Sequence, residues 1–289
     1  MTRILLHLHN ALFLKILLFG EDWGGPECAA YIPISTHIKE SSAWVVILLA
    51  IGFQFNFQRT IRQFYDKTST FLALRAKIPP LQRVFEIMIA SLYFIMFGVL
   101  FIVKLWTQAL VHMLQPCHLF LVIQGYAILS QTATGALLTL LMLPPQTGAL
   151  FAIAMPAING VTVVEVYIFW IQHILLTLMP IYLLIRNDFV ATRFCSFTLL
   201  FIGIWTFAMT HFTLYEIIGV SFQVNPDFII CPTYGMRELF ANFPPYLLYP
   251  SYRTFTTIMF ATLAIVQSYV YYWIARNVLY LWVASSANI

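Results

Sequence analysis

Charged side chains are scarce in this sequence. Only 9% of the 289 residues are Asp, Glu, Lys or Arg, whereas 61% are hydrophobic and 17% are aromatic. Soluble domains carry roughly 25% charged residues. The composition therefore excludes a soluble globular protein and predicts an integral membrane protein. Because backbone groups in lipid must be paired internally, we expect one helical bundle with short loops, with residues 1–289 as a single domain.

The sequence also lacks the motifs of several kinds of binding and catalytic site. It has no Gly-rich phosphate loop, no G-x-S-x-G motif of serine hydrolases, no H-E-x-x-H and no paired C-x-x-C. No basic and aromatic stripe is present, and the net charge of +4 is modest. We therefore expect no metal, no cofactor and no nucleic-acid partner.

Long apolar runs predict the membrane-spanning helices. Six runs of roughly 17 to 28 residues are long enough to cross a bilayer; they are 42–58, 85–109, 117–142, 162–185, 195–222 and 255–283. A shorter run, 147–160, predicts a half-length or tilted helix lining a cavity. Residues 4–19 predict an interfacial helix, with a signal peptide as the alternative. The expected fold is all-α, a polytopic membrane bundle of about seven transmembrane helices.

Basic residues predict the orientation of the bundle. The loop 59–83 carries six Lys or Arg residues against one Asp, so the positive-inside rule places it in the cytosol. Seven spans then put the N-terminal segment 1–41 and the loop 223–254 on the lumenal side, with a cytosolic C-terminus. Six spans would move Arg186 and Arg193 to the lumenal side, so seven are favoured. Lys104 and Glu165, near the ends of spans, are expected to extend toward the membrane surface.

Four cysteines limit the disulfide chemistry. Cys195 lies near the cytosolic end of its predicted span, while Cys28, Cys117 and Cys231 lie on or near the lumenal side. Three cysteines cannot all pair. A disulfide between Cys28 and Cys231 would leave Cys117 as a free thiol. The alternatives are that Cys117 takes part in the bridge or is an inert buried thiol, and spacing does not decide among them.

The short stretch "QPCHL" contains a candidate nucleophile. Pro116 suits the first turn of a helix, which puts Cys117 where unpaired N–H groups favour a thiolate and a developing oxyanion. The neighbouring His118 is poorly placed as a base because side chains at i and i+1 diverge on a helix. We therefore expect the base from another span, with His173 and His211 as the candidates.

A seven-residue spacing predicts the polar face of a substrate pocket. Cys117, Gln124 and Gln131 share one helix face, with His211 and Tyr215 as further walls. The alternative interpretation is that the glutamines and histidines only join helices by hydrogen bonds.

Four stretches in the same order resemble the transmembrane protein 164 family: "GGPECAA", "QPCHL", "FWIQHILLTLMPIYLL" and "IIGVSFQVNPDFIICP". The resemblance runs from about Gly24 through Pro232 and weakens in the basic loop and after Pro232. Non-apolar positions match as well, which makes the resemblance specific in so apolar a chain. One departure is Gln115, where the family usually has asparagine.

The resemblance implies a lipid-remodelling acyltransferase with Cys117 as nucleophile and His173 as catalytic histidine. Such an enzyme would move a polyunsaturated acyl chain from a donor glycerophospholipid to a lyso ether phospholipid, without a cofactor, in the endoplasmic reticulum or Golgi membrane. His173 would protonate the leaving hydroxyl and later deprotonate the acceptor hydroxyl. The partners are then the two lipids and the bilayer.

Two matters stay open at this stage. A seven-span receptor, a transporter or a non-enzymatic lipid-binding protein are the rival functions. The predicted boundaries also put His173 about 16 Å deeper in the membrane than Cys117, because eleven residues of helix rise 1.5 Å each. Either the segment "ALVHMLQP" turns back into the membrane and lowers Cys117, or the span that carries His173 begins later than residue 162.

Overall fold

The computed structural model describes residues 23–74, 79–158, 160–187, 197–241, 244, 249 and 251–286. The interfacial helix expected at 4–19, together with Arg193 and Cys195, lies outside these residues. Helices dominate the described part of the chain, which contains no strand; an isolated backbone bridge joins Gly24 and Val224. The prediction of an all-α fold is confirmed.

Five long apolar helices have the length and composition to cross a membrane. They are α3 (Ile34–Gln54), α5 (Pro80–Trp106), α9 (Val163–Arg186), α13 (Tyr252–Ser286) and the continuous run of α10 (Phe197–Thr210), η5 (His211–Tyr215) and α11 (Glu216–Phe222). A sixth is counted if α7 (Ala133–Met142) and α8 (Thr147–Ala154), bent by 45°, act as one broken span. The described residues thus support five or six spans rather than the expected seven.

The prediction of one span over 117–142 is wrong, because the structure has two helices there. α6 covers Pro116–Leu129, and α7 starts at Ala133. Between them, the hydroxyl of Thr132 accepts a hydrogen bond from the N–H of Gly135 and caps α7. Ser and Thr side chains favour such caps over helix interiors, which hydropathy alone does not register. The predicted short helix in 147–160 is present as α8.

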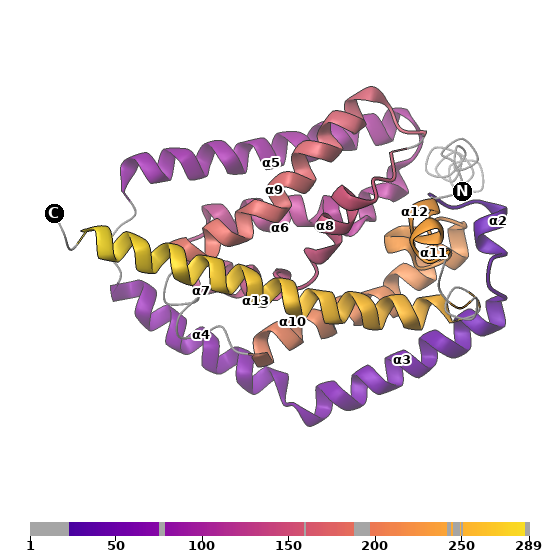
Figure 1. Ribbon diagram of the computed structural model, residues 1–289, viewed down its shortest axis with the longest axis horizontal. Coiled ribbons are helices and arrows are strands. Elements are labelled where there is room, and N and C mark those ends of the chain that lie inside the picture. Colours follow the sequence, from indigo (N-terminus) through magenta and orange to yellow (C-terminus); the bar gives the residue numbers. More distant parts are fainter. Residues whose placement is uncertain are drawn as a thin grey trace, which may run out of the picture.

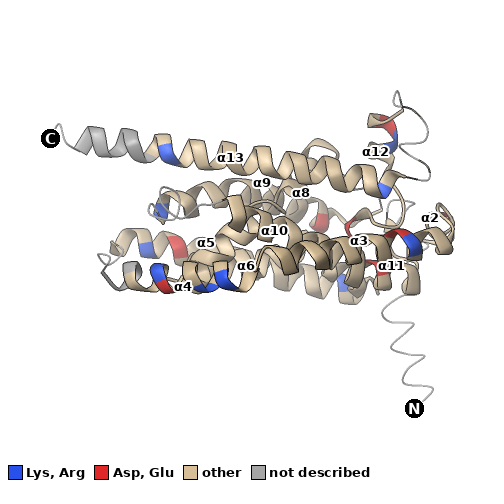
Figure 2. Ribbon diagram, turned by 90° about the horizontal axis from the view of Figure 1, so that it is seen from below, with Lys and Arg blue, Asp and Glu red and all other residues tan. Residues whose placement is uncertain are grey.

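The predicted basic loop 59–83 is mostly a helix, α4 (Phe57–Leu74). Its buried positions, Phe57, Phe64 and Thr68, recur at helical spacing and face the bundle, while its described Lys and Arg residues are exposed. Figure 2 shows these basic residues at the end of the molecule where α13 finishes. An amphipathic helix of this kind suits the boundary between lipid and water.

Short elements gather at the opposite end of the bundle (Figure 1). They are α2 (Pro26–Ala29), η6 (Pro226–Phe228) and α12 (Tyr234–Leu239), the last two within the predicted loop 223–254. A disulfide between Cys28 and Cys231, with the Cα atoms 5.3 Å apart, joins α2 to this segment. This is the pairing that leaves Cys117 free.

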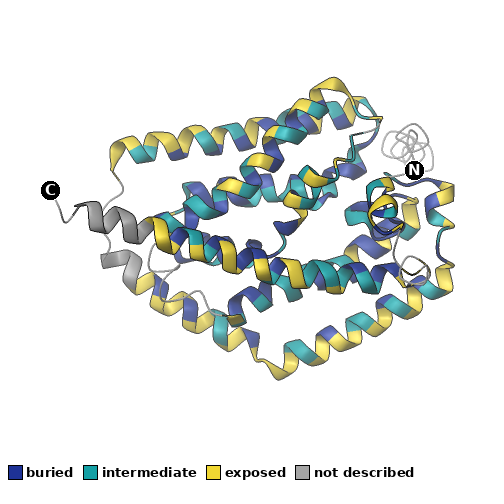
Figure 3. Ribbon diagram, viewed as in Figure 1, coloured by how far each residue is buried: buried dark blue, intermediate teal, exposed yellow. Residues whose placement is uncertain are grey.

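The outer faces of the long helices are exposed, as Figure 3 shows for α3 and α5, and many of the exposed side chains are large and hydrophobic. Phe53 on α3 and Trp106 on α5 are 93% and 86% exposed. In water such surfaces would be unstable, whereas in a bilayer they contact lipid tails. The multi-pass membrane class is therefore supported by packing as well as by composition.

Candidate functional site

The centre of the bundle holds a cavity with a volume of about 210 Å³. Helices α5, α6, α8, α9, α10 and α13 all contribute to its wall (Figure 1). Apolar side chains such as Phe151, Phe260 and Ala264 cover much of that wall. Polar groups also line it, and these are Lys104, Gln115, Cys117, His118, Glu165, Gln172, His173, His211 and Asp227. An amphiphile would find both kinds of surface here.

Cys117 lies in the first turn of α6, as predicted from Pro116. It is a free, partly buried thiol on the cavity wall. It lies beside the N–H groups at the start of α6, and Gln172 from α9 lines the same cavity. Unpaired N–H groups at a helix start stabilise a thiolate or a nearby oxyanion.

His173 lines the same cavity from α9 and is 3% exposed. Its Nδ1 is 2.7 Å from the backbone oxygen of Phe169. A carbonyl oxygen only accepts hydrogen bonds, so Nδ1 carries the proton and Nε2 keeps a lone pair. In its neutral form His173 can therefore act as a base through Nε2, and the preceding residue, Gln172, lines the same cavity as Cys117.

Cys117 and His173 line one cavity, and the chain before Cys117 turns back toward the bundle. α5 ends at Trp106, and Gln108, with a φ of 56°, turns the chain back toward the bundle. The short helix η3 (Leu110–Leu114) that follows is buried at its centre and leads directly into α6. α9 begins at Val163, so the alternative of a later start does not apply.

His118 and His112 have structural roles beside the site. The Nδ1 of His118 is 2.8 Å from the backbone oxygen of His112, which links α6 to η3. Burial, reinforced by the charges of Lys104 and His118, lowers the pKa of His112 to about 3. His112 therefore stays neutral at physiological pH.

Lys104 and Glu165 form an ion pair inside the cavity wall, 2.6 Å between Nζ and Oε1, instead of extending to the surface as expected. Glu165 also receives a hydrogen bond from the N–H of Thr162 and so caps α9. The pair joins the end of α5 to the start of α9. Because each charge neutralises the other, both can remain buried.

Three of the predicted pocket residues are not on the cavity wall. Gln124 is fully buried and accepts a hydrogen bond from the hydroxyl of Tyr93, which joins α6 to α5. Gln131 is exposed in the break between α6 and α7. Tyr215 packs in the apolar cluster that contains Cys28 and Cys231. For Gln124 the structure matches the alternative interpretation, a hydrogen bond that joins helices.

His211 does line the cavity, and it has an acidic partner that the sequence did not reveal. Its Nδ1 lies 2.6 Å from Oδ2 of Asp227, another residue of the cavity wall. His211 starts the π-helical turn η5, and such turns are frequent at functional sites. The signal that could have found Asp227 is the turn sequence "NPD" next to a cysteine-containing loop.

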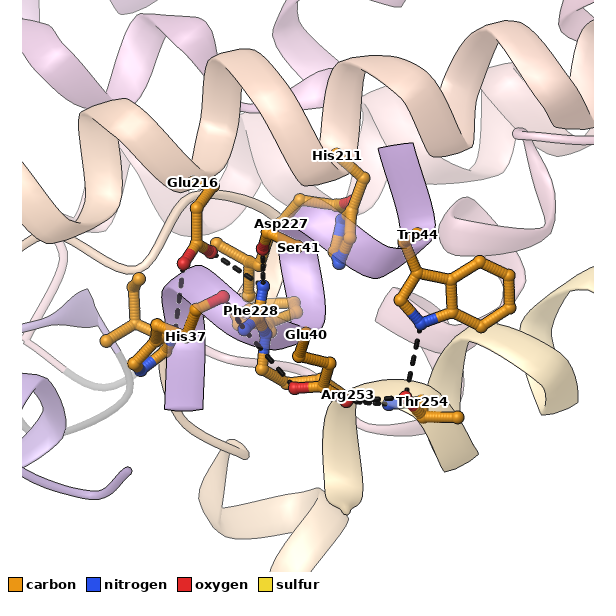
Figure 4. Close-up of polar contacts among 12 residues, drawn as sticks. His37, Glu40, Ser41, Trp44, His211, Glu216, Asp227, Phe228, Arg253 and Thr254 are labelled. Atoms are coloured by element: carbon orange, nitrogen blue, oxygen red, sulfur yellow. Dashed lines mark hydrogen bonds and ion pairs between the residues drawn. The ribbon is translucent and has the colours of Figure 1, made fainter. Parts of the chain in front are cut away.

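A network of buried charges lies next to this pair (Figure 4). The guanidinium of Arg253, at the start of α13, donates hydrogen bonds to Glu216 and Ser41 at 2.7 Å and to Glu40 at 3.3 Å. His37 lies 3.1 Å from the other oxygen of Glu216. These contacts join α3, α11 and α13, and the sequence alone gave no indication of them.

A bundle of long apolar helices around an internal cavity with buried polar groups defines a polytopic α-helical membrane protein. The chain belongs to the TMEM164 family, whose model matches residues 34–267. The match includes Cys117, His173, His211 and Asp227, and it extends past Pro232 into α13. No solved structure matches the chain.

Proposed function

We propose that this protein is a phospholipid acyltransferase that moves an acyl chain through a thioester at Cys117. The observation that carries the proposal is a free thiol at a buried helix start, in one cavity with the neutral imidazole of His173. A nucleophile with a base from another element is the usual arrangement for acyl transfer.

In the first half-reaction the sulfur of Cys117 attacks the ester carbonyl carbon of a donor glycerophospholipid. The thiol proton passes to Nε2 of His173, and the N–H groups at the start of α6 stabilise the oxyanion. The ester C–O bond then breaks, the lyso product leaves as a hydroxyl compound, and the acyl chain stays on sulfur. In the second half-reaction the hydroxyl of a lyso ether phospholipid attacks the thioester and restores the thiol.

The cavity wall suits this chemistry in two ways. Phe151, Phe260 and Ala264 offer an apolar surface for an acyl chain. Burial also keeps water away from the thioester, which favours transfer to a lipid hydroxyl over hydrolysis. The acyl group moves between esters of similar energy, so the reaction requires neither ATP nor coenzyme A.

We further propose that the end with the disulfide faces the lumen and that the basic helix α4 faces the cytosol. A disulfide persists in an oxidising compartment, and basic residues gather on the cytosolic side of membrane proteins. This orientation places the C-terminus in the cytosol and is consistent with the endoplasmic reticulum or Golgi membrane.

The direct test uses purified protein in vesicles that contain a phospholipid with an isotopically labelled polyunsaturated chain. We expect mass spectrometry to find the labelled acyl group on Cys117, released by hydroxylamine as a thioester, and to find labelled product after addition of a lyso ether phospholipid. Cys117→Ala should abolish both signals, while the matched variant Cys195→Ser should retain them. His173→Gln should slow acylation by about 100-fold or more.

The rival functions make the opposite prediction. A receptor, a transporter or a lipid-binding scaffold would show no acyl adduct, and lipid composition would not respond to Cys117→Ala or His173→Gln. Full transfer activity in Cys117→Ala would refute the thioester mechanism.

A further inference from the structure

Three imidazoles line the cavity, and the mechanism above uses only His173. His118 is bound through Nδ1 to the backbone oxygen of His112, which leaves His211 to be explained. His211 comes from the π-helical turn η5, whereas His173 comes from α9, so two different elements present imidazoles to one cavity. Only His211 has a carboxylate partner, Asp227, with 2.6 Å between Nδ1 and Oδ2. The side chains of the pair are 14% and 21% exposed, so the contact is largely shielded from water.

The backbone at Asp227 is held in place by Gln115, the residue that precedes the helix of the nucleophile. The side-chain oxygen of Gln115 accepts a hydrogen bond from the N–H of Asp227 at 2.9 Å, and its amide nitrogen donates to the oxygen of Asn225 at 3.3 Å. Asp227 and Phe228 both have positive φ, 52° and 54°, a conformation that costs energy and that cavity contacts must maintain.

The two imidazoles differ in the proton transfer that suits them. A carboxylate on Nδ1 fixes the tautomer and stabilises the imidazolium that forms when Nε2 takes a proton. His173 has only a backbone carbonyl at Nδ1, which fixes the tautomer but gives the cation less support. A thiol is a much stronger acid than an alcohol, so the Cys117 thiol needs less help from its base than a lipid hydroxyl does. A lipid hydroxyl is a far weaker acid and benefits from the carboxylate.

We propose that His211, oriented by Asp227, is the acid–base group for the lipid hydroxyl in both half-reactions, while His173 serves the thiol. The inference rests on the proposed acyltransferase function. The resemblance to the family implied that His173 makes all the proton transfers. Here these transfers are divided between His173 and His211.

The protons balance over the cycle. At the start His211 is an imidazolium and His173 is neutral. The Cys117 thiol gives its proton to His173, the S–C bond forms, the ester C–O bond breaks, and the leaving oxygen takes the proton of His211. In the second half the acceptor hydroxyl returns a proton to His211, its oxygen attacks the thioester, and the departing sulfur regains the proton held by His173.

Two acyl donors separate these roles. A phospholipid releases an alkoxide oxygen that needs a proton, whereas a p-nitrophenyl ester of the same fatty acid releases a stable anion that needs none. Acylation of Cys117 by each donor is measured by mass spectrometry in wild-type protein and in His211→Gln, Asp227→Asn and His173→Gln. Asp227 is a positioning residue, and Asn at this site retains the left-handed backbone conformation.

We expect His211→Gln and Asp227→Asn to slow acylation by the phospholipid about 100-fold and to leave acylation by the nitrophenyl ester within about 3-fold of wild type. His173→Gln should slow both. Thr213→Val, which removes the hydrogen bond from Thr213 to Met209 in the same turn, is the matched control and should change neither rate.

Equal loss with both donors in His211→Gln, or no loss with either, would overturn the assignment. Equal loss would mean a role in folding or binding, and no loss would mean that His211 is not used. If wild-type protein forms no adduct with either donor, the acyltransferase function itself fails, and the assignment fails with it.

Discussion

Two buried arginines, one at each end of the bundle, bind different kinds of group. Arg253 is 1% exposed and binds side chains: the carboxylates of Glu216 and Glu40 and the hydroxyl of Ser41. Arg186 is 5% exposed and binds mainly backbone oxygens. Its guanidinium donates hydrogen bonds of 2.6 to 3.1 Å to the backbone oxygens of Ala127, Ile128 and Ser130, at the end of α6.

The difference shows two reasons to bury a cation in an apolar bundle. Arg253 neutralises two acids and so joins three helices that are distant in sequence. Arg186 instead satisfies carbonyls that α6 leaves unpaired where it ends inside the protein. Arg83 supports it by donating to Leu129 at 2.9 Å and to Glu86 at 3.2 Å. The first site is thus expected to be more sensitive to the loss of its cation than the second.

The largest effect is expected from Arg253→Met, which leaves two acids buried without their cation. Removing one partner from a buried ionic network costs about 3–5 kcal/mol of stability. Thermal unfolding in detergent would measure it, with Arg276→Met on the exposed face of α13 as the matched control. Adding Glu216→Gln should recover part of the loss. Equal melting temperatures for Arg253→Met and Arg276→Met would disprove the ionic role.

Loss of the disulfide should come next and should weaken only the Arg253 end. The double variant Cys28→Ser, Cys231→Ser is expected to lose about 2–4 kcal/mol, since the bond closes a loop of 203 residues. Hydrogen exchange should increase in α2 and residues 225–231 but not in α6 or α9. Uniform exchange across the protein would contradict this local effect.

Arg186→Met also breaks the 3.5 Å ion pair between Arg186 and Glu86, but it should cost less, about 2 kcal/mol, because Arg83 still pairs with Glu86 and binds the end of α6. This variant should also show faster hydrogen exchange in residues 126–132, which comprise the last turn of α6 and the break that follows it. Arg186→Lys keeps the charge, but its donors all lie on one nitrogen and cannot reproduce contacts made by two guanidinium nitrogens, so we expect an intermediate value. A loss as large as that of Arg253→Met would remove the distinction between the two sites.

The smallest losses of stability are expected on the helix face that the sequence predicted for Cys117. There the buried Gln124 and the exposed Gln131 can be compared. Tyr93→Phe removes the hydrogen bond to Gln124 and should cost about 1 kcal/mol. Gln131→Ala, in the exposed break after α6, should change stability by less than about 0.5 kcal/mol. Both are measured by thermal unfolding, and a larger effect at Gln131 would contradict its exposed position.

Hydropathy predicted most of the fold. The run 162–185 matches α9 within one residue at each end, because a long apolar helix bounded by Thr162 and Arg186 carries clear signals. The break at Ser130–Thr132 was missed, since three polar residues hardly change the mean over a 26-residue run. The basic segment resembles a loop in a hydropathy profile because its charged residues lower the mean hydropathy, although Phe57 and Phe64 recur at helical spacing.

The sequence predicted only those residues of the candidate site that are marked by their neighbours in the chain. The position of Cys117 followed from Pro116, and His173 followed from the resemblance to a family. Asp227 and Arg253 were missed because their partners lie 16 and 37 residues or more away, and only folding brings them together. The prediction of Gln131 as a pocket residue is wrong because α6 ends before it, and that of Gln124 is wrong because its side chain binds Tyr93 on α5.

The short length of α6 has a consequence for the depth of the sulfur. Fourteen residues of helix span about 21 Å, so a rod fixed by Arg83 and Arg186 at one end determines where Cys117 stands at the other. Because Gln115 holds the other end of α6, the sulfur stands on a strut that is fastened at both ends of the bundle.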